Sequence, residues 1–285
     1  MFLDVRGLRY HVRCWGRDGA PKIFMLHGLQ DVSASYQFLV DELRGDWQVL
    51  APDWRGFGLT QWAGLDSYWF PDYLADLEAL LERVCPDHPA RVIGHSMGAN
   101  ISTLYAGIRP RRLRWLVNLE GIGLAPSAPD QAAGRYAQWL DELKQPLRAG
   151  RYRSVEQLAT VLKRRNPRLP ADVAEFVAHA WSRSAADEGG VRLAFDPRHR
   201  LVNPVLYRRE EAEACWSRIE IPMLLVMGEA SKHFQRRLQY LPDERLGQLF
   251  RNVRIVTLKD VGHMMHYEDP QAVARAILEF ERTCP

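Results

Sequence analysis

The amino-acid sequence predicts an α/β fold, in which helices cover both faces of a mostly parallel sheet and a helical segment interrupts it. Over roughly the first 120 residues, short apolar strands alternate with amphipathic helical stretches. This alternation stops at residue 122 and resumes near residue 206. We therefore expect an α/β core of residues 1–121 and 206–285, with residues 122–205 inserted as a helical cap.

The first half of the core is expected to follow a regular order. Two short strands are predicted within residues 2–15, and others at 23–26, 47–51, 91–93 and 113–119. Helices are predicted from Tyr73 to Val84, where Pro86 follows, and from Met97 to Ile108. Strands that alternate with helices in this way pair in parallel and are buried on both faces.

The inserted segment shows helical patterns and no convincing strand. Ser154 and Gln157 have the spacing of a capping box, and a second amphipathic stripe begins at Val173. Strands are expected again at 223–227 and 253–258. A last helix is predicted to start at the Asp269-Pro270 pair and to run to about Arg282.

Composition narrows the class of protein. The chain has 285 residues, 47% of them apolar and 26% charged, which is typical of a globular protein and not of a disordered one. Its 38 basic and 35 acidic residues produce no strong field, so nucleic-acid binding is not expected. A monomer and a homodimer both remain open.

The expected location is the cytoplasm. The four cysteines are scattered without close pairs, which fits reduced thiols better than a disulfide scaffold. The N-terminal residues lack the apolar core of a signal peptide. No apolar run approaches the roughly 20 residues that a membrane helix needs, so stable membrane insertion is not expected.

The strongest chemical signal is Gly94-His95-Ser96-Met97-Gly98, which matches G-x-S-x-G between a predicted strand and a predicted helix. A serine between glycines can occupy a strained turn that lifts its hydroxyl above the sheet edge. Backbone N–H groups at the start of the helix then favour developing negative charge. We expect the N–H of Met97 to pair with that of Leu29, after His27-Gly28, as an oxyanion hole. His27 itself is interpreted as structural.

A base for this serine is expected at the other end of the chain. His263 follows Gly262 in a loop beyond the last predicted strand, which would bring it to the same sheet edge as Ser96. Histidine suits this task because its unperturbed pKa lies near neutrality. His95 is a poor base for its neighbour, since successive side chains on such a turn diverge. His266 is interpreted as a packing residue.

These motifs, together with Asp53–Gly58, resemble the α/β-hydrolase superfamily in their order along nearly the whole chain. The resemblance implies a mostly parallel eight-stranded sheet, with the insertion in the place of the family's cap. It implies a mainly structural loop at Asp53–Gly58. It also implies an acid near position 231, but Ser231 stands there and cannot bear the charge that orients a histidine.

Two carboxylates could replace the missing acid. Glu120 ends the strand that follows the nucleophile strand, where some members of the superfamily carry their acid. Glu229 directly follows the strand at 223–227. We favour Glu120, keep Glu229 as the alternative, and note that Glu120 could instead pair with an arginine as a structural residue.

The expected reaction is acyl transfer through an acyl-enzyme on Ser96, which cleaves a small, partly apolar carboxylic ester. Dehalogenases and epoxide hydrolases of this fold use an aspartate where this chain has Ser96. No cofactor is expected, and no metal, because His263 and His266 give only two candidate ligands.

Several rival functions remain open. The same three residues could serve a thioesterase, lactonase, acyltransferase or carbon–carbon hydrolase. The missing acid at Ser231 favours a ligand-binding, receptor-like protein with little turnover. We expect aromatic residues of the insertion to form a roof over an apolar pocket: Tyr136, Trp139, Phe176 and Trp181.

Overall fold

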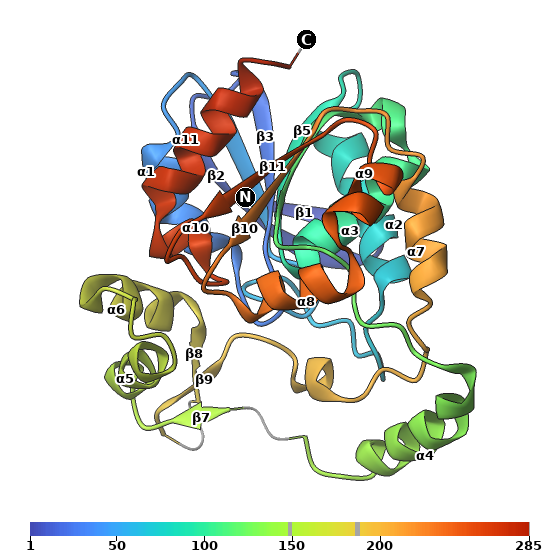
Figure 1. Ribbon diagram of the computed structural model, residues 1–285. Coiled ribbons are helices and arrows are strands. Elements are labelled where there is room, and N and C mark those ends of the chain that lie inside the picture. The colour runs from blue at the N-terminus through green and yellow to red at the C-terminus, as the bar shows by residue number, and fades with distance from the viewer. Residues whose placement is uncertain (148–149, 186–188, 285) are drawn as a thin grey trace.

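An eight-stranded sheet forms the centre of the computed structural model, which describes residues 1–147, 150–185 and 189–284 (Figure 1). Its order is β1-β2-β4-β3-β5-β6-β10-β11. The strands are β1 (Phe2–Val5), β2 (Leu8–Gly16), β3 (Lys22–Leu26), β4 (Gln48–Pro52), β5 (Ala90–His95), β6 (Leu113–Leu119), β10 (Met223–Gly228) and β11 (Val253–Leu258). β2 pairs antiparallel with β1 and β4, and the other pairs are parallel. The predicted mostly parallel sheet is confirmed.

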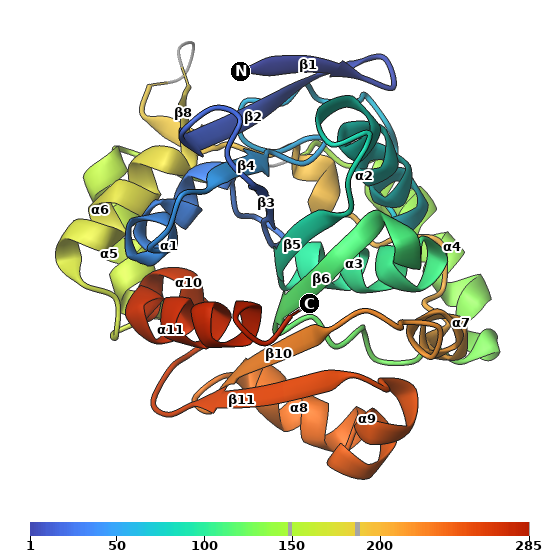
Figure 2. The ribbon, with the colours of Figure 1, turned by 90° about the horizontal axis from the view of Figure 1, so that it is seen from above.

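Helices cover both faces of this sheet, as Figure 2 shows. α1 and α11 lie on one face and α2, α3 and α7 on the other. The helices of the core are α1 (Gln37–Glu42), α2 (Phe70–Val84), α3 (Met97–Ile108), α7 (Arg209–Trp216), α8 (Lys232–Tyr240), α9 (Asp243–Leu249), α10 (Met265–Glu268) and α11 (Pro270–Glu281), with 3₁₀ turns at Ser33–Tyr36 and Pro110–Arg112. As expected, Asp269 caps α11, and its side chain accepts from Ala272 N at 2.9 Å.

The central strands are apolar throughout because both of their faces are buried. In β3, Ile23 and Met25 join the apolar cluster that includes residues of α1 and α11. Phe24 and Leu26 join the cluster on the side of α2 and α3. This explains why the sequence shows continuous apolar runs here instead of an alternation with polar residues.

The segment 122–205 lies between β6 and β10 and contributes no strand to the eight-stranded sheet. In Figure 1 its elements lie below the core. They are a 3₁₀ turn at Pro129–Gln131, α4 (Ala132–Leu143), β7 (Arg151–Tyr152), α5 (Val155–Arg165), α6 (Ala171–Ala180), β8 (Ser182–Ser184), β9 (Val191–Leu193) and a 3₁₀ turn at Pro197–Arg200.

The description of this segment as helical was incomplete, because β7, β9 and β8 form a small antiparallel sheet. Strands of two or three residues are too short to show an alternating pattern. The expected cap of α5 is present, since Ser154 Oγ accepts from Gln157 N at 3.3 Å. The Gln157 side chain, however, accepts from Arg153 N and not from Ser154 N. Among the described residues, no helix is both long and apolar enough to cross a membrane.

Candidate active site

Ser96 stands at a sharp turn between β5 and α3. Its backbone has φ 50° and ψ −111°, a conformation that non-glycine residues rarely adopt. Position 98, two residues later, requires glycine because the chain passes close to β3 there. A Cβ at this position would lie 2.0 Å from the carbonyl oxygen of Leu26. The turn therefore presents the Ser96 side chain above the carboxyl ends of the parallel strands, as the sequence pattern predicts.

The Gly28 turn lies directly against Ser96. A Cβ on Gly28 would meet the Ser96 Cβ at 3.1 Å. His27 is fully buried; its Nε2 accepts from Trp54 N at 2.9 Å, and its Nδ1 donates to the carbonyl of Gly28 at 2.8 Å. These contacts fit a structural His27. In the described chain, the N–H groups of Leu29 and Met97 donate to no protein acceptor, which leaves both available to a ligand.

Glu120 is the carboxylate next to His263. It follows β6 with a left-handed φ of 57° and is 2% exposed. His263 Nδ1 donates to Glu120 Oε2 at 2.6 Å, while Gly228 N donates to Oε1 at 2.7 Å. Asn118 fixes the turn, since its side chain exchanges two hydrogen bonds with the backbone of Gly121, each 2.7 Å long. Of the two candidate acids, Glu120 is the one that the structure brings to His263.

Ser231 and Glu229 take different positions. Glu229 is exposed and, among the described residues, forms no ion pair or side-chain hydrogen bond. Ser231 caps α8, where its Oγ accepts from His233 N at 3.0 Å and donates to Glu120 Oε2 at 2.7 Å. The residue at the family's usual acid position therefore supports the acid at position 120 with a hydrogen bond.

The His263 loop is held from two sides. His95 Nε2 donates to the carbonyl of His263 at 2.9 Å. The Glu268 carboxylate accepts from Gly262 N at 2.7 Å and from Met264 N at 3.2 Å. It also accepts from the side chain of Asn166, the residue that ends α5, at 2.7 Å. His263 uses Nδ1 for its hydrogen bond with Glu120, so Nε2 is the ring nitrogen that does not contact this carboxylate.

Two other histidines pack against the His263 ring. His233 stacks on it, with ring centroids 3.9 Å apart, and His95 lies at 4.7 Å. Burial, together with the neighbouring His263, lowers the pKa of His233 to about 4. Burial also holds the pKa of His95 well below its ordinary value. Both neighbours are thus uncharged near neutral pH.

Ser96 and His263 both contact the end of β6, where Ser96 N donates to the carbonyl of Leu119 at 2.8 Å and His263 contacts Glu120, but they form no hydrogen bond with each other. Within the described residues, the Ser96 hydroxyl makes no hydrogen bond. Catalytic hydrogen bonds are often long in ligand-free enzymes and tighten with substrate. Ser96 is only partly exposed, and a rotation about its Cα–Cβ bond is the change that would redirect its hydroxyl.

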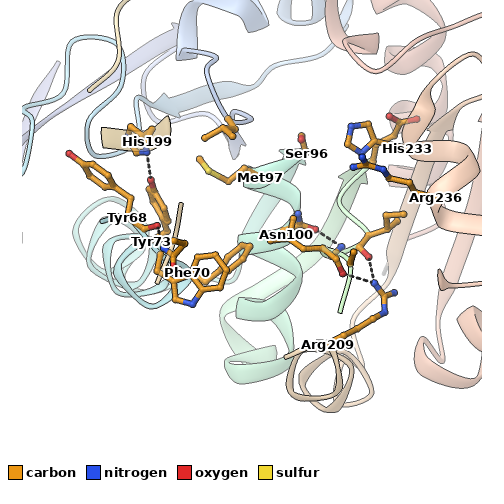
Figure 3. Close-up of a pocket in the computed structure, with 18 of the residues that line it drawn as sticks. Tyr68, Phe70, Tyr73, Ser96, Met97, Asn100, His199, Arg209, His233 and Arg236 are labelled. Carbon is orange, nitrogen blue, oxygen red and sulfur yellow. Dashed lines mark hydrogen bonds between the residues drawn. The ribbon is translucent and has the colours of Figure 1, made fainter. Parts of the chain in front are cut away.

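A cavity of about 500 Å³ opens beside Ser96. Leu29, Met97 and Glu120 also line it; His263 does not, but its stacking partner His233 does. In Figure 3, Tyr68, Phe70 and Tyr73 stand on one side of Ser96, and His233, Arg209 and Arg236 on the other. The site therefore combines an aromatic wall with a polar one.

The expected aromatic roof was wrong. None of Tyr136, Trp139, Phe176 and Trp181 lines the cavity. Phe176 packs on Phe38, and the Trp181 indole donates to Asp31 Oδ1 at 2.9 Å. The aromatic wall comes instead from α2 and the loop before it, through Tyr68, Phe70 and Tyr73.

The loop at Asp53–Gly58 is buried and supports the core. Asp53 Oδ1 accepts from Ser33 N at 2.7 Å, and Oδ2 contacts His11 Nδ1 at 2.8 Å. Burial alone would raise the pKa of Asp53, but the hydrogen bond from His11 and the charge of His27 lower it below its ordinary value. This agrees with the structural role that the resemblance implies.

Asp31, His95 and His266 form the one group of three possible metal ligands in the described residues. His266 Nε2 lies 3.2 Å from Asp31 Oδ2, and all three residues are buried. Two imidazoles and a carboxylate are a donor set that Zn²⁺ accepts. Asp31 Oδ1 accepts from the backbone of Val32 and from the Trp181 indole, whereas Oδ2 is the oxygen that faces His266. His266 thus belongs to a buried group with Asp31 and His95, and His263 does not.

Sequence reasoning missed His233, Asn118 and the role of Ser231. Ser231 carried a readable signal, since a serine before a helix is a common N-cap. His233 carried none, because its position over His263 depends on how α8 packs against the loop after β11.

Comparisons with known proteins agree with the fold. The family model described as the alpha/beta hydrolase family matches residues 23–276. A serine hydrolase-like protein of Danio rerio is 24% identical over 93% of this chain and 83% of its own length. The 2-(acetamidomethylene)succinate hydrolase of Mesorhizobium japonicum is 25% identical over 98% of this chain and 93% of its own.

Solved structures extend this likeness. The thioesterase domain from the curacin biosynthetic pathway has a TM-score of 0.86 and 25% identity, with 98% of each chain covered. The family match spans most of the chain, and the sheet order and the Ser96 turn fit it. The chain belongs to the alpha/beta hydrolase family.

Proposed function

We propose that this hydrolase cleaves a carboxylic ester through an acyl-enzyme on Ser96. The observation that carries the proposal is the buried Glu120, hydrogen-bonded to His263 at 2.6 Å, on the sheet edge where Ser96 occupies its strained turn. A carboxylate on Nδ1 fixes the tautomer that leaves Nε2 unprotonated and ready to accept a proton.

The reaction follows from these positions. The Ser96 oxygen attacks the ester carbonyl while His263 Nε2 takes its proton, and the N–H groups of Leu29 and Met97 bind the oxyanion. The C–O bond then breaks as His263 protonates the leaving alcohol. Water attacks the acyl-enzyme with His263 again as base, and the carboxylic acid leaves as Ser96 regains its proton.

Labelling with a fluorophosphonate tests this function. Peptide mass spectrometry is expected to find the adduct on Ser96, and hydrolysis of p-nitrophenyl esters is expected to stop with it. Ser67 also lines the cavity, so Ser67→Ala is the matched control that keeps labelling, whereas Ser96→Ala loses it. An unlabelled Ser96 in a protein that hydrolyses no ester would reject the proposal and favour a receptor-like role.

A thioester is the second candidate substrate class. It is favoured by the likeness to the thioesterase domain, at 25% identity over nearly the full length of both chains. The same steps apply, with the C–S bond breaking as His263 protonates the leaving thiol. Comparing kcat/KM for an oxygen ester and a thioester of one acyl group distinguishes the two classes.

A further inference from the structure

Arginines dominate the charged lining of the cavity beside Ser96. Arg198, Arg209 and Arg236 line it, and Glu120 is the acidic residue among the lining residues. Both carboxylate oxygens of Glu120 already accept hydrogen bonds from protein groups. Arg198 is paired with the buried Asp196 at 3.8 Å, so the positive charge that the cavity offers comes from Arg209 and Arg236.

Arg209 begins α7 and is buried, with 6% of its surface exposed. Its Nε donates to Glu213 at 2.9 Å, and Nη1 donates to the carbonyls of Ile122 and Leu124. Nη2 is buried without a hydrogen-bonding partner. Glu213 also pairs with Arg245 at 2.8 Å, so one carboxylate serves two arginines and a positive charge is left over.

Arg236 lies on the cavity side of α8, one turn after His233 and one turn before Tyr240, all three of which line the cavity. It is exposed, and within the described residues it forms no ion pair. The next residue, Arg237, is buried and pairs with Asp243 instead. His233 is neutral near pH 7 because burial lowers its pKa to about 4, so Arg236 supplies the charge at this wall.

The two sides of Ser96 thus differ in chemistry (Figure 3). The aromatic rings of Tyr68, Phe70 and Tyr73 suit an apolar group. Arg236 and Arg209 suit an oxyanion group such as a carboxylate or a sulfate, which guanidinium groups bind through paired hydrogen bonds. Resting on the proposed function, we propose that the substrate is an acidic ester whose anionic group binds at Arg236 and Arg209.

Matched pairs of esters test this inference. In the first pair, the acyl group is glutarate, as its p-nitrophenyl monoester, against the neutral methyl ester of the same compound. In the second pair, the leaving group carries the charge: the butyrate ester of 4-hydroxybenzoate against that of methyl 4-hydroxybenzoate. A charge-assisted hydrogen bond predicts that the acidic member of one pair has a kcat/KM about tenfold higher or more.

Variants then assign the preference to the arginine. Arg236→Gln is expected to lower the ratio of kcat/KM for the acidic over the neutral ester about tenfold. Lys232→Gln removes one positive charge from the same helix outside the cavity, and it is expected to keep the wild-type ratio. Arg236 is exposed, so the variant is expected to fold.

The outcomes separate the two proposals. Equal rates for acidic and neutral esters, or an unchanged ratio in Arg236→Gln, would overturn the anion site while Ser96 labelling still supports a hydrolase. Loss of Ser96 labelling together with inactivity on all four esters would instead reject the hydrolase itself.

Discussion

Glu120 accepts three hydrogen bonds, from Gly228 N, Ser231 Oγ and His263 Nδ1. Two of these donors meet at the same oxygen, Oε2. A carboxylate satisfies them all, whereas a side-chain amide must turn either an NH₂ group or a single oxygen toward them. A glutamate at position 120 can therefore accept from His263 Nδ1 while it also accepts from Gly228 N and Ser231 Oγ.

Glu120→Gln is expected to lower kcat by about 10⁴-fold, the scale observed when a catalytic histidine is held in the wrong tautomer. Steady-state hydrolysis of a p-nitrophenyl ester measures the effect. Glu229→Gln is the control, because Glu229 is exposed, and we expect less than a twofold change. The reverse ranking of the two variants would refute the assignment of the acid.

The sequence could identify Ser96 and His263 because their signals are local, namely glycines around a turn and a histidine after the last strand. For the acid, the sequence favoured Glu120 and left Glu229 as the alternative. Local patterns could not decide between them, since the answer depends on where the backbone after β6 turns. The left-handed φ of Glu120 makes that turn. The position of Arg236 in the wall of the cavity was not foreseen, because only the packing of α8 brings this residue there.

At the scale of elements, the β5–Ser96–α3 unit depends on close contact between backbones. A Cβ at Gly98 would lie 2.0 Å from the carbonyl oxygen of Leu26 and 2.8 Å from that of His27. Such contacts force the backbone to shift, and so they disturb the strand, the turn and the helix together.

Gly98→Ala is expected to lower the free energy of unfolding by about 1–3 kcal/mol or more, as measured by urea denaturation. Gly134→Ala is the matched control. Gly134 lies within α4 and a Cβ there meets no atom within 4 Å, so the substitution is expected to stabilise by up to about 1 kcal/mol. A Gly98→Ala protein as stable as the wild type would contradict the packing described for the turn.

Long, strongly patterned elements were predictable from sequence and short ones were not. The helix from Met97 to Ile108 and the strands from β1 to β6 follow from apolar patterning and from proline and glycine boundaries. β7, β8 and β9 have two or three residues each. Their pairing depends on the fold of the insertion, which no local pattern encodes.

At the scale of the whole molecule, several buried histidines make stability depend on pH. His199 packs between the rings of Phe57 and Tyr68, and burial lowers its pKa from 6.5 to about 3. Between those values the unfolded chain binds a proton that the folded protein does not. The free energy of unfolding that the neutral His199 contributes is therefore fully present above pH 6.5. It is lost as the pH falls toward 3.

Urea denaturation at pH 7.5 and pH 5 is expected to show lower stability at pH 5. One such histidine contributes at most about 1.4 kcal/mol per pH unit within this window. His199→Phe keeps a ring in the stack and removes the titrating group, so its loss of stability on acidification is expected to be smaller. His88 is exposed, and His88→Gln is expected to lose as much as the wild type. Equal losses in all three proteins would contradict the assignment.

The hydrogen bond from Asn166 to Glu268 has a mechanical consequence. The Glu268 carboxylate accepts hydrogen bonds from the backbone N–H groups on both sides of His263. It also accepts from Asn166, which follows α5 of the inserted segment. A displacement of α5 away from the core must either break this link or pull on the loop that carries the imidazole. The inserted segment is thus tied through Asn166 and Glu268 to the loop that carries His263.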